Sequence, residues 1–237
     1  MKTSFSAQPG RAHAFGQTLS GARLVLVVLA ALWLAGCSSL VSQAPAMAHY
    51  DLGPGGLETR HDAPAAARRQ GGLSLARVEV MAPPWLESSA MQYRLEASDP
   101  ARRRAYALSR WVAPPPALLD QVLTRSLGSS GAVGVGGAGC RLRVELDEFI
   151  QRFDAAGQSY AELLVRAQLL PERAGGTLAA RAFDISVAAP SADAPGGVHA
   201  HRAASHELAR ALADWLRALD TDQGVHDACA ALASRTN

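Results

Sequence analysis

The residue with the clearest chemistry in the sequence is Cys37, because of the segment that precedes it. Residues 1–36 contain three cations and no carboxylate, and residues 24–35 are twelve apolar residues in succession. A cationic start followed by an apolar run of this length is typical of a secretory signal peptide, and the run is too short to span a bilayer core of roughly 30 Å. The thiol of Cys37 therefore lies where a signal peptide ends.

The sequence Leu34, Ala35, Gly36, Cys37 resembles a bacterial lipobox. In lipoproteins of that kind the signal peptide is removed before the cysteine, the thiol carries diacylglycerol and the new amino group is acylated. Several acyl chains provide a stable attachment that a single chain does not. The next residue is Ser38, whereas an aspartate would resemble a signal for retention in the inner membrane. We therefore predict lipid attachment at Cys37 and an anchor in the periplasmic face of the outer membrane.

Two other interpretations of this segment leave the cysteine unmodified. Residues 1–36 could be an ordinary signal peptide with a cysteine near its end by chance, or an anchor that is not cleaved. The small pair Ala35 and Gly36 directly before the cysteine favours cleavage and lipidation.

Removal of the predicted signal peptide changes the net charge of the chain, and only the net charge of the remaining chain bears on its function. It leaves 201 of the 237 residues, enough for one domain with a sizeable core. The chain has 23 Lys and Arg residues against 21 Asp and Glu, but Lys2, Arg11 and Arg23 leave with the signal peptide, so 20 cations remain and the net charge is −1. We therefore expect no nucleic-acid partner.

Cys140 and Cys229 are the two cysteines that remain once Cys37 carries lipid. An even number of cysteines in an oxidising compartment favours one disulfide between them, and two buried free thiols are the alternative. The bridge would close a loop of about 90 residues, which the chain-entropy description of disulfides associates with a stabilisation on the order of 4 kcal/mol.

A glycine-rich segment contains a pattern that is associated with nucleotide binding. Gly134, Gly136 and Gly139 match G-x-G-x-x-G, whose glycines let a pyrophosphate approach the start of a helix. Such a site needs a strand, then the loop, then a helix, whereas the order predicted here is helix, loop, strand. We expect no nucleotide cofactor.

One cluster resembles a set of metal ligands: His199, His201, His206 and Glu207. Two ligands on one helix face need a spacing of three or four residues, but these histidines are spaced by two and five. We therefore expect no metal. The sequence also lacks the G-x-S-x-G pattern of a nucleophile elbow, so we predict a protein without catalytic or cofactor-binding residues.

The first half of the mature chain is predicted to be a tether followed by strands. Residues 37–72 are rich in Ala, Pro, Gly and Ser, and a short edge strand could form at 49–52. A single domain is expected over residues 73–237. It begins with a strand at 73–80, in which a change of parity indicates a bulge or a strand covered on both faces. A hairpin follows, with strands at 91–96 and 104–111 and a turn at Asp99 and Pro100.

The second half contains the strongest periodic patterns. A helix is predicted to start at the proline run 114–116 and to end with a C-cap at Gly128. Residues 141–149, 162–169 and 178–187 alternate in the manner of antiparallel strands with one solvated, charged face, and residues 198–220 and 225–233 have helical spacing. We expect an α+β two-layer sandwich, in which a mainly antiparallel sheet carries two principal helices on one face.

Several short motifs together resemble the ABC-type transport auxiliary lipoprotein family, which includes the paraquat-inducible C-type proteins. Besides the lipobox they are Tyr50-Asp51-Leu52, Pro84-Trp85-Leu86, Trp111-x-x-Pro114 and a late strand containing Phe149. The resemblance covers roughly residues 48–220.

This resemblance implies a non-enzymatic periplasmic component of a lipid transport system of the mammalian-cell-entry type. Such a system has an ATP-driven permease and a tunnel-forming substrate-binding protein, which the lipoprotein would dock. The resemblance allows a homo-oligomeric ring, and it implies that a sheet face or edge carries the contacts. The alternatives are a lipopolysaccharide-assembly lipoprotein that plugs an outer-membrane β-barrel, a lipid-anchored hydrolase, and a structural lipoprotein that links envelope layers.

Overall fold

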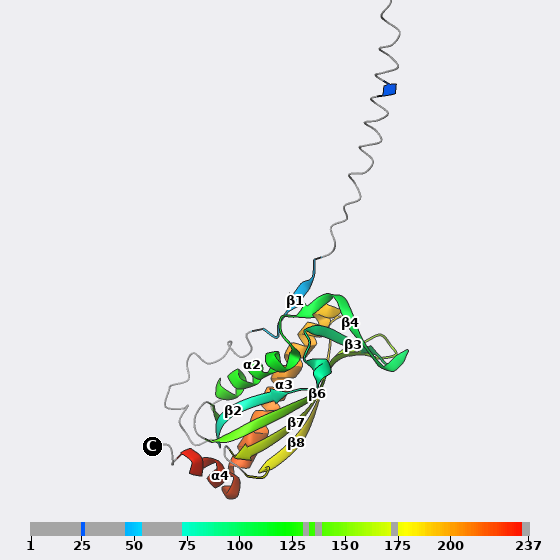
Figure 1. The fold of residues 1–237 in the computed structure, drawn as a ribbon. Coiled ribbons are helices and arrows are strands. Elements are labelled where there is room, and N and C mark those ends of the chain that lie inside the picture. Colours follow the sequence, from blue (N-terminus) through cyan, green and yellow to red (C-terminus); the bar gives the residue numbers. More distant parts are fainter. Residues whose placement is uncertain are drawn as a thin grey trace, which may run out of the picture. The chain divides into compact units, whose positions relative to one another are not determined.

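The structure is a computed structural model that describes residues 25–26, 46–53, 73–129, 133–135, 139–171 and 175–233. The chain divides into two compact units, Met1–Pro45 and Ala46–Asn237, and the architecture that follows is that of the second unit. Its strands form one sheet of eight, and two long helices pack against this sheet (Figure 1). The predicted α+β fold is confirmed.

The second unit contains eight strands and four helical segments among the residues that the structure describes. The strands are β1 (Ala48–Tyr50), β2 (Leu73–Met81), β3 (Ala90–Leu95), β4 (Asp99–Trp111), β5 (Val133–Val135), β6 (Cys140–Phe153), β7 (Ser159–Pro171) and β8 (Ala179–Ala188). The helices are the 3-10 turn η2 (Pro84–Leu86), α2 (Pro115–Ser129), α3 (Ala194–Asp220) and α4 (Gln223–Ala233). Among the residues that the structure describes, none of the helices has the length and apolar character needed to cross a membrane.

One side of the sheet, from β6 to the edge strand β8, is the antiparallel meander that the alternating patterns predict. β6 pairs with β7 from Cys140 opposite Pro171 to Phe153 opposite Ser159, and β7 pairs in turn with β8. The apolar side chains of these strands face α2 and α3 and form one hydrophobic core with them, while the charged side chains, apart from the buried Glu148, face solvent. Period-two alternation produces this division because successive side chains of a strand point to opposite faces.

The other edge of β6 is shared by two strands. β2 runs parallel to the first half of β6, from Leu75 beside Cys140 to Met81 beside Glu145. β3 runs parallel to its end, from Tyr93 beside Gln151. Between them the chain leaves the sheet through a proline pair and η2, since proline cannot donate a ladder hydrogen bond. The β2–β3 junction therefore lies beside the middle of β6.

Three predicted details can be compared with the structure: the bulge in β2, the β3–β4 turn and the end of α2. The parity change in β2 is a bulge between Leu75 and Arg77. The turn of the β3–β4 hairpin lies at residues 96–98, and Asp99 and Pro100 already belong to β4, where proline is tolerated at a strand's start. Helix α2 continues through Gly128 to Ser129, so that glycine is not the residue after the helix.

Helix α3 begins four residues before the predicted start, because Asp193 caps it. The Asp193 carboxylate accepts a hydrogen bond from the Gly196 amide at 2.8 Å, and Pro195 occupies the first turn, where its missing N–H costs nothing. A Cβ atom at Gly197 would lie 2.1 Å from Oε1 of Gln151, so only glycine allows the helix to approach the sheet this closely.

Gln151 connects the start of α3 to the sheet. Its Nε2 donates to Oγ of Ser159 at 2.9 Å and to the carbonyl of Asp193 at 3.0 Å, and its Oε1 accepts from the Tyr106 hydroxyl at 2.8 Å. Burial raises the pKa of Tyr106 well above its usual value, with a further contribution from Tyr93. Tyr106 is therefore a hydrogen-bond donor at all physiological pH values.

The segment around β1 belongs to the same compact unit. β1 pairs in parallel with the end of β4, with Ala48 beside Ser109, and Leu52 is buried in the core. The short strand expected at residues 49–52 thus occupies Ala48–Tyr50, and ordered packing starts before residue 73.

Candidate docking surface

The predicted lipid-attachment site lies outside the described residues. Leu34, Ala35, Gly36 and Cys37 all belong to the segment 27–45, for which the structure gives no description. Lipid attachment at Cys37 therefore stays a prediction, and the features below belong to the second compact unit.

The structure separates the histidines of the predicted polar cluster. His201 is buried between the rings of Trp111 and Phe149, and its Nδ1 donates to the Gly197 carbonyl at 2.8 Å. Burial lowers the pKa of His201 to about 4, so its imidazole is neutral at physiological pH. His199 is exposed. Within the described ranges, no three His, Cys, Asp or Glu side chains are placed to hold a metal.

The remaining histidine of that cluster, His206, is half-buried one turn further along α3. Burial lowers its pKa, and the nearby cations Arg202 and Arg210 add to this effect. Glu207 lies beside it on an exposed position of the same helix. Neither side chain joins His201 in a common site.

The glycine-rich segment has a structural explanation. Gly134 lies in β5, which pairs in parallel with β2, and the order along the chain is helix α2, β5, β6. A Cβ atom at Gly139 would lie 2.1 Å from the carbonyl oxygen of Ser74, so glycine is needed for β5–β6 to approach β2. Gly136 lies outside the described residues.

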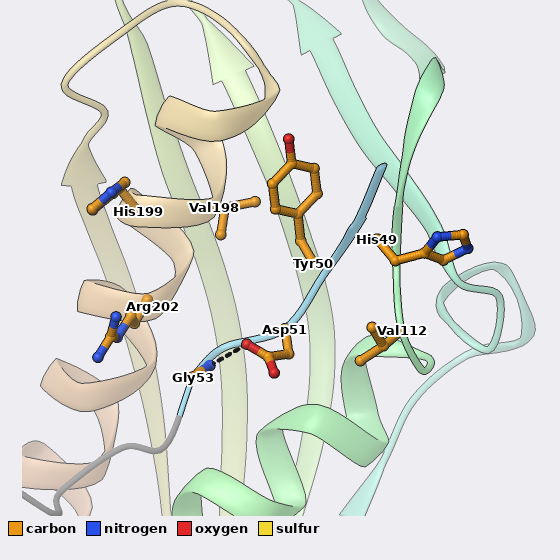
Figure 2. Close-up of a pocket in the computed structure, with 8 residues that line it drawn as sticks. All are labelled: His49, Tyr50, Asp51, Gly53, Val112, Val198, His199 and Arg202. Atoms are coloured by element: carbon orange, nitrogen blue, oxygen red, sulfur yellow. Dashed lines mark hydrogen bonds between the residues drawn. The ribbon is translucent and has the colours of Figure 1, made fainter. Parts of the chain in front are cut away.

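A depression of about 280 Å³ lies between β1 and the start of α3 (Figure 2). The ring of Tyr50 points toward Val198 across it, whereas His49 points away from His199 and Arg202, which project from the helix. Because its polar groups do not converge, the depression has no arrangement suited to catalysis.

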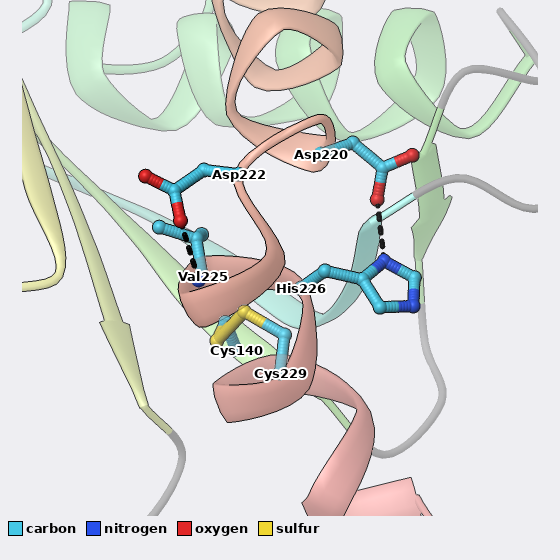
Figure 3. The surroundings of a disulfide bond; sticks show 6 residues. All are labelled: Cys140, Asp220, Asp222, Val225, His226 and Cys229. Carbon is cyan, nitrogen blue, oxygen red and sulfur yellow. Dashed lines mark hydrogen bonds and ion pairs between the residues drawn. A yellow bond between two sulfur atoms is a disulfide. The ribbon is translucent and has the colours of Figure 1, made fainter.

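Cys140 and Cys229 are joined by a disulfide that holds α4 against the sheet (Figure 3). Cys140 is the first residue of β6 and Cys229 lies in α4, and both are buried. The connection from α3 to α4 is held by His226, whose Nδ1 lies 2.9 Å from an Asp220 carboxylate oxygen. That contact raises the pKa of His226.

The solvent face of the sheet consists largely of paired charges, as the sequence predicts. Arg166 of β7 donates to both carboxylate oxygens of Asp147 at 2.7 Å and lies 3.1 Å from Glu145. Hydrogen bonding from Arg166 lowers the pKa of Asp147. These are cross-strand pairs on neighbouring strands, not an acid and base poised over a substrate.

The β2–β3 junction differs from the rest of this face because it exposes large apolar side chains. Met81 is 51% exposed and Trp85 is 53% exposed. Trp85 is nevertheless held in place: the next residue, Leu86, is buried in the core, and Nε2 of Gln92 donates to the Trp85 carbonyl at 2.7 Å. The backbone around an exposed indole ring is thus fixed on both sides.

A buried ion-pair cluster supports the ring of Trp85. The Arg103 guanidinium carbon lies 5.9 Å from the centroid of the Trp85 ring, and its Nη2 donates to Glu148 at 2.7 Å. Arg94 donates to the same carboxylate oxygen at 3.1 Å, and the Glu148 side chain is only 8% exposed. Arg103 is therefore fixed beside the ring.

The exposed ring faces a cavity of about 400 Å³ that also contains Arg143. One wall is formed by Met81, Pro83 and Trp85, and Arg143 comes from the neighbouring strand β6. We call Met81, Pro83, Trp85 and Arg143 the junction surface. From the sequence alone, Trp85 stands out only as part of a family motif, and Arg143 is predicted to belong to a solvated row of charges. A proline pair that interrupts a strand directly before a tryptophan was the signal available.

A comparison with known families decides the identity of the chain. The family model described as the ABC-type transport auxiliary lipoprotein component matches residues 56–213. The chain belongs to this family. The auxiliary lipoprotein is therefore associated with an ABC-type transport system, and the predicted resemblance is confirmed.

Two solved structures are similar to the auxiliary lipoprotein in fold. Protein XCC0632 from Xanthomonas campestris has a TM-score of 0.57 and 19% sequence identity, and the match covers 65% of this chain and 87% of that chain. A second, uncharacterised protein has a TM-score of 0.54 and 15% identity, with 72% and 99% covered. At such identities the likeness concerns the fold alone. A search of the curated proteins finds no match.

Proposed function

We propose that this auxiliary lipoprotein is a non-catalytic component of an intermembrane lipid transport system of the mammalian-cell-entry type, anchored by Cys37 in the outer membrane. The observation that supports it is the family match over residues 56–213 together with the lipobox at Leu34–Cys37. An ABC-type system drives transport from the inner membrane, so a lipid-anchored auxiliary component of it has to work in the periplasm.

The proposed task is to dock the periplasmic substrate-binding component of that system. The geometry supports the docking of a partner protein more than it supports catalysis. In the described part of the chain the histidines are dispersed and most charges of the sheet face are paired, whereas the β2–β3 junction presents a fixed, exposed tryptophan. Rigid exposed aromatic side chains are typical anchors of protein interfaces.

Isolation of the tagged full-length lipoprotein from membranes tests this function. We expect the mammalian-cell-entry-type protein and its ABC permease to be recovered with it, and the reverse isolation to recover the lipoprotein. Recovery of an outer-membrane β-barrel in their place would contradict the proposal and favour the lipopolysaccharide-assembly alternative. Measuring the mass of the recovered assembly determines whether several copies of the lipoprotein form a ring.

A further inference from the structure

Trp85 has the features of an interface anchor that is already ordered before binding. Of the described tryptophans, Trp111 and Trp215 are buried and only Trp85 is exposed. Its backbone is fixed by the neighbouring prolines and by Gln92, and its ring lies beside the immobilised Arg103. A side chain that is ordered beforehand loses little conformational entropy when a partner covers it, so little of the free energy gained by burying the ring is lost on binding.

Arg143 lies in the same cavity and is a cation without a partner. Among the described residues it has no ion pair and no hydrogen bond, and its Nε is buried without an acceptor. The carboxylates nearby are already engaged, because Glu79 pairs with Arg77 at 2.5 Å, and Arg166 pairs with both Asp147 and Glu145. A guanidinium has five N–H donors in a fork that fits a carboxylate, and here the fork is free.

We propose that the junction surface binds a polypeptide segment in which a carboxylate lies beside a large apolar side chain, the carboxylate pairing with Arg143 and the apolar group packing on Met81 and Trp85. The identity of the partner, the mammalian-cell-entry-type protein, rests on the proposed function; the chemistry of the segment does not. The two unmatched features of the cavity, one cation and one apolar wall, correspond to the two parts of this segment.

A protein segment fits this cavity better than a lipid headgroup at a membrane surface. The cavity of about 400 Å³ has room for one or two side chains only, while a phospholipid brings two long acyl chains.

Binding of a short peptide to the detergent-solubilised full lipoprotein tests the chemistry. The probes are acetyl-Ala-Asp-Phe-Ala-amide and the same peptide with Asn in place of Asp. Protection of Trp85 fluorescence from acrylamide measures binding, since the other described tryptophans are buried. We expect saturable protection by the Asp peptide, at least tenfold weaker binding of the Asn peptide, and the same loss with Arg143→Gln. Arg141→Gln is the matched control, two residues earlier on the same strand, and should change binding less than twofold.

Equal binding of both peptides, unchanged binding to Arg143→Gln, or no protection at all would overturn the inference. Protection by phosphatidylglycerol vesicles that depends on Arg143, in the absence of peptide protection, would also overturn it and assign the site to a headgroup. Trp85→Phe identifies the fluorescence signal, because it should remove the acrylamide-sensitive component.

The identity of the partner is tested separately by co-isolation of the mammalian-cell-entry-type protein. Trp85→Ala and Arg143→Glu should reduce its recovery at least tenfold, whereas Leu108→Ala, at another exposed apolar residue, and Arg141→Glu should not. If wild type and all variants recover the mammalian-cell-entry-type protein equally, the proposed docking function is supported, but the junction surface is not the site of docking. If the peptide binds as expected and the wild type recovers no such protein, the surface stands and the proposed partner is wrong.

Discussion

Cys140 and Cys229 are 89 positions apart in the sequence, and their Cα atoms lie 5.0 Å apart across a disulfide. The bond joins the start of the longest strand to the last described helix. It closes nearly half of the second compact unit into one covalent loop and holds α4 against the start of β6 (Figure 3).

Removal of this disulfide should lower the stability of the domain. For Cys140→Ala/Cys229→Ala we expect the free energy of unfolding to fall by about 4 kcal/mol, because the unfolded chain regains the entropy of a loop of about 90 residues. Urea denaturation measures this. Wild type in a reductant that opens the bond is the control and should approach the variant; equal midpoints for oxidised wild type and variant would contradict the expectation.

Two adjacent carboxylates of β6 should differ strongly in their contribution to stability. Glu148 is buried and shared by Arg94 and Arg103, so Glu148→Ala leaves two partly buried guanidinium groups without a counterion and should cost about 3 kcal/mol. Asp147 pairs with an exposed Arg166, and Asp147→Ala should cost less than about 1 kcal/mol. Urea denaturation of the two variants side by side makes each the control of the other. Similar losses for both would show that burial does not decide the effect.

A methyl group at Gly197 should loosen the contact between α3 and the sheet. In Gly197→Ala the new Cβ would meet Oε1 of Gln151, which must then give up hydrogen bonds to Tyr106, Ser159 or Asp193; we expect a loss of about 1–3 kcal/mol in thermal unfolding. Gly176→Ala, where a Cβ meets nothing within 4 Å, is the control. The double variant with Gln151→Ala should lose less than the sum of the single variants. Strict additivity would exclude this clash.

The buried His201 should make the fold less stable as the pH falls. Its pKa is about 4 in the folded state, against an ordinary value of about 6.5 in the unfolded chain, so between these values the unfolded state binds a proton that the native state does not. We expect the free energy of unfolding to be independent of this group above pH 7 and to lose roughly 3 kcal/mol by pH 4.

The variant His201→Leu tests this pH dependence. The readout is the slope of the free energy of unfolding against pH between pH 7 and pH 4, not the stability at pH 7. We expect this slope to flatten. His226 is a control of opposite sign, because Asp220 raises its pKa: it stabilises the fold below its unfolded pKa, and this contribution is lost as the pH rises through the folded value. A His201→Leu variant with the full wild-type slope would contradict the assignment.

The proposed lipid anchor depends on one residue. Cys37→Ser should abolish labelling with palmitate and release the protein from the membrane fraction into the periplasm, because the other acyl chain is added only after lipidation and cleavage. Cys229→Ser is the control, since it removes a different cysteine and should leave labelling intact. Continued labelling of Cys37→Ser would show that the lipobox is not the attachment site.

Most of the secondary structure was predictable, because side-chain periodicity reports it locally. The alternation of β6 and β7 and the apolar stripe of α3 each require only neighbouring residues to be read. The sequence was less informative at element ends. The cap at Asp193 was missed because the helical periodicity becomes clear only after Val198. The β3–β4 turn was predicted at Asp99 and Pro100 because proline is common in turns, but this proline lies inside β4.

The candidate docking surface was not predictable in the same way. Arg143 has the same sequence environment as Arg141, but Arg141 lies 4.0 Å from a Glu79 carboxylate oxygen, whereas the carboxylates near Arg143 are engaged by Arg77 and Arg166 and leave it without an ion pair among the described residues. Those partners come from other strands. Trp85 resembles a core residue in the sequence, and its exposure follows from the way η2 leaves the sheet beside β6.

The sequence by itself determined the α+β class and the even number of cysteines beyond Cys37, since these depend on local periodicity or counting. The secretory segment and the lipobox at Cys37 are predictions that rest on composition. Only the tertiary structure decided that β2 and β3 share one edge of β6, which side chains are buried, and which cations are left without partners. These properties depend on distances between residues far apart in the chain, and such distances exist only once the sheet has formed.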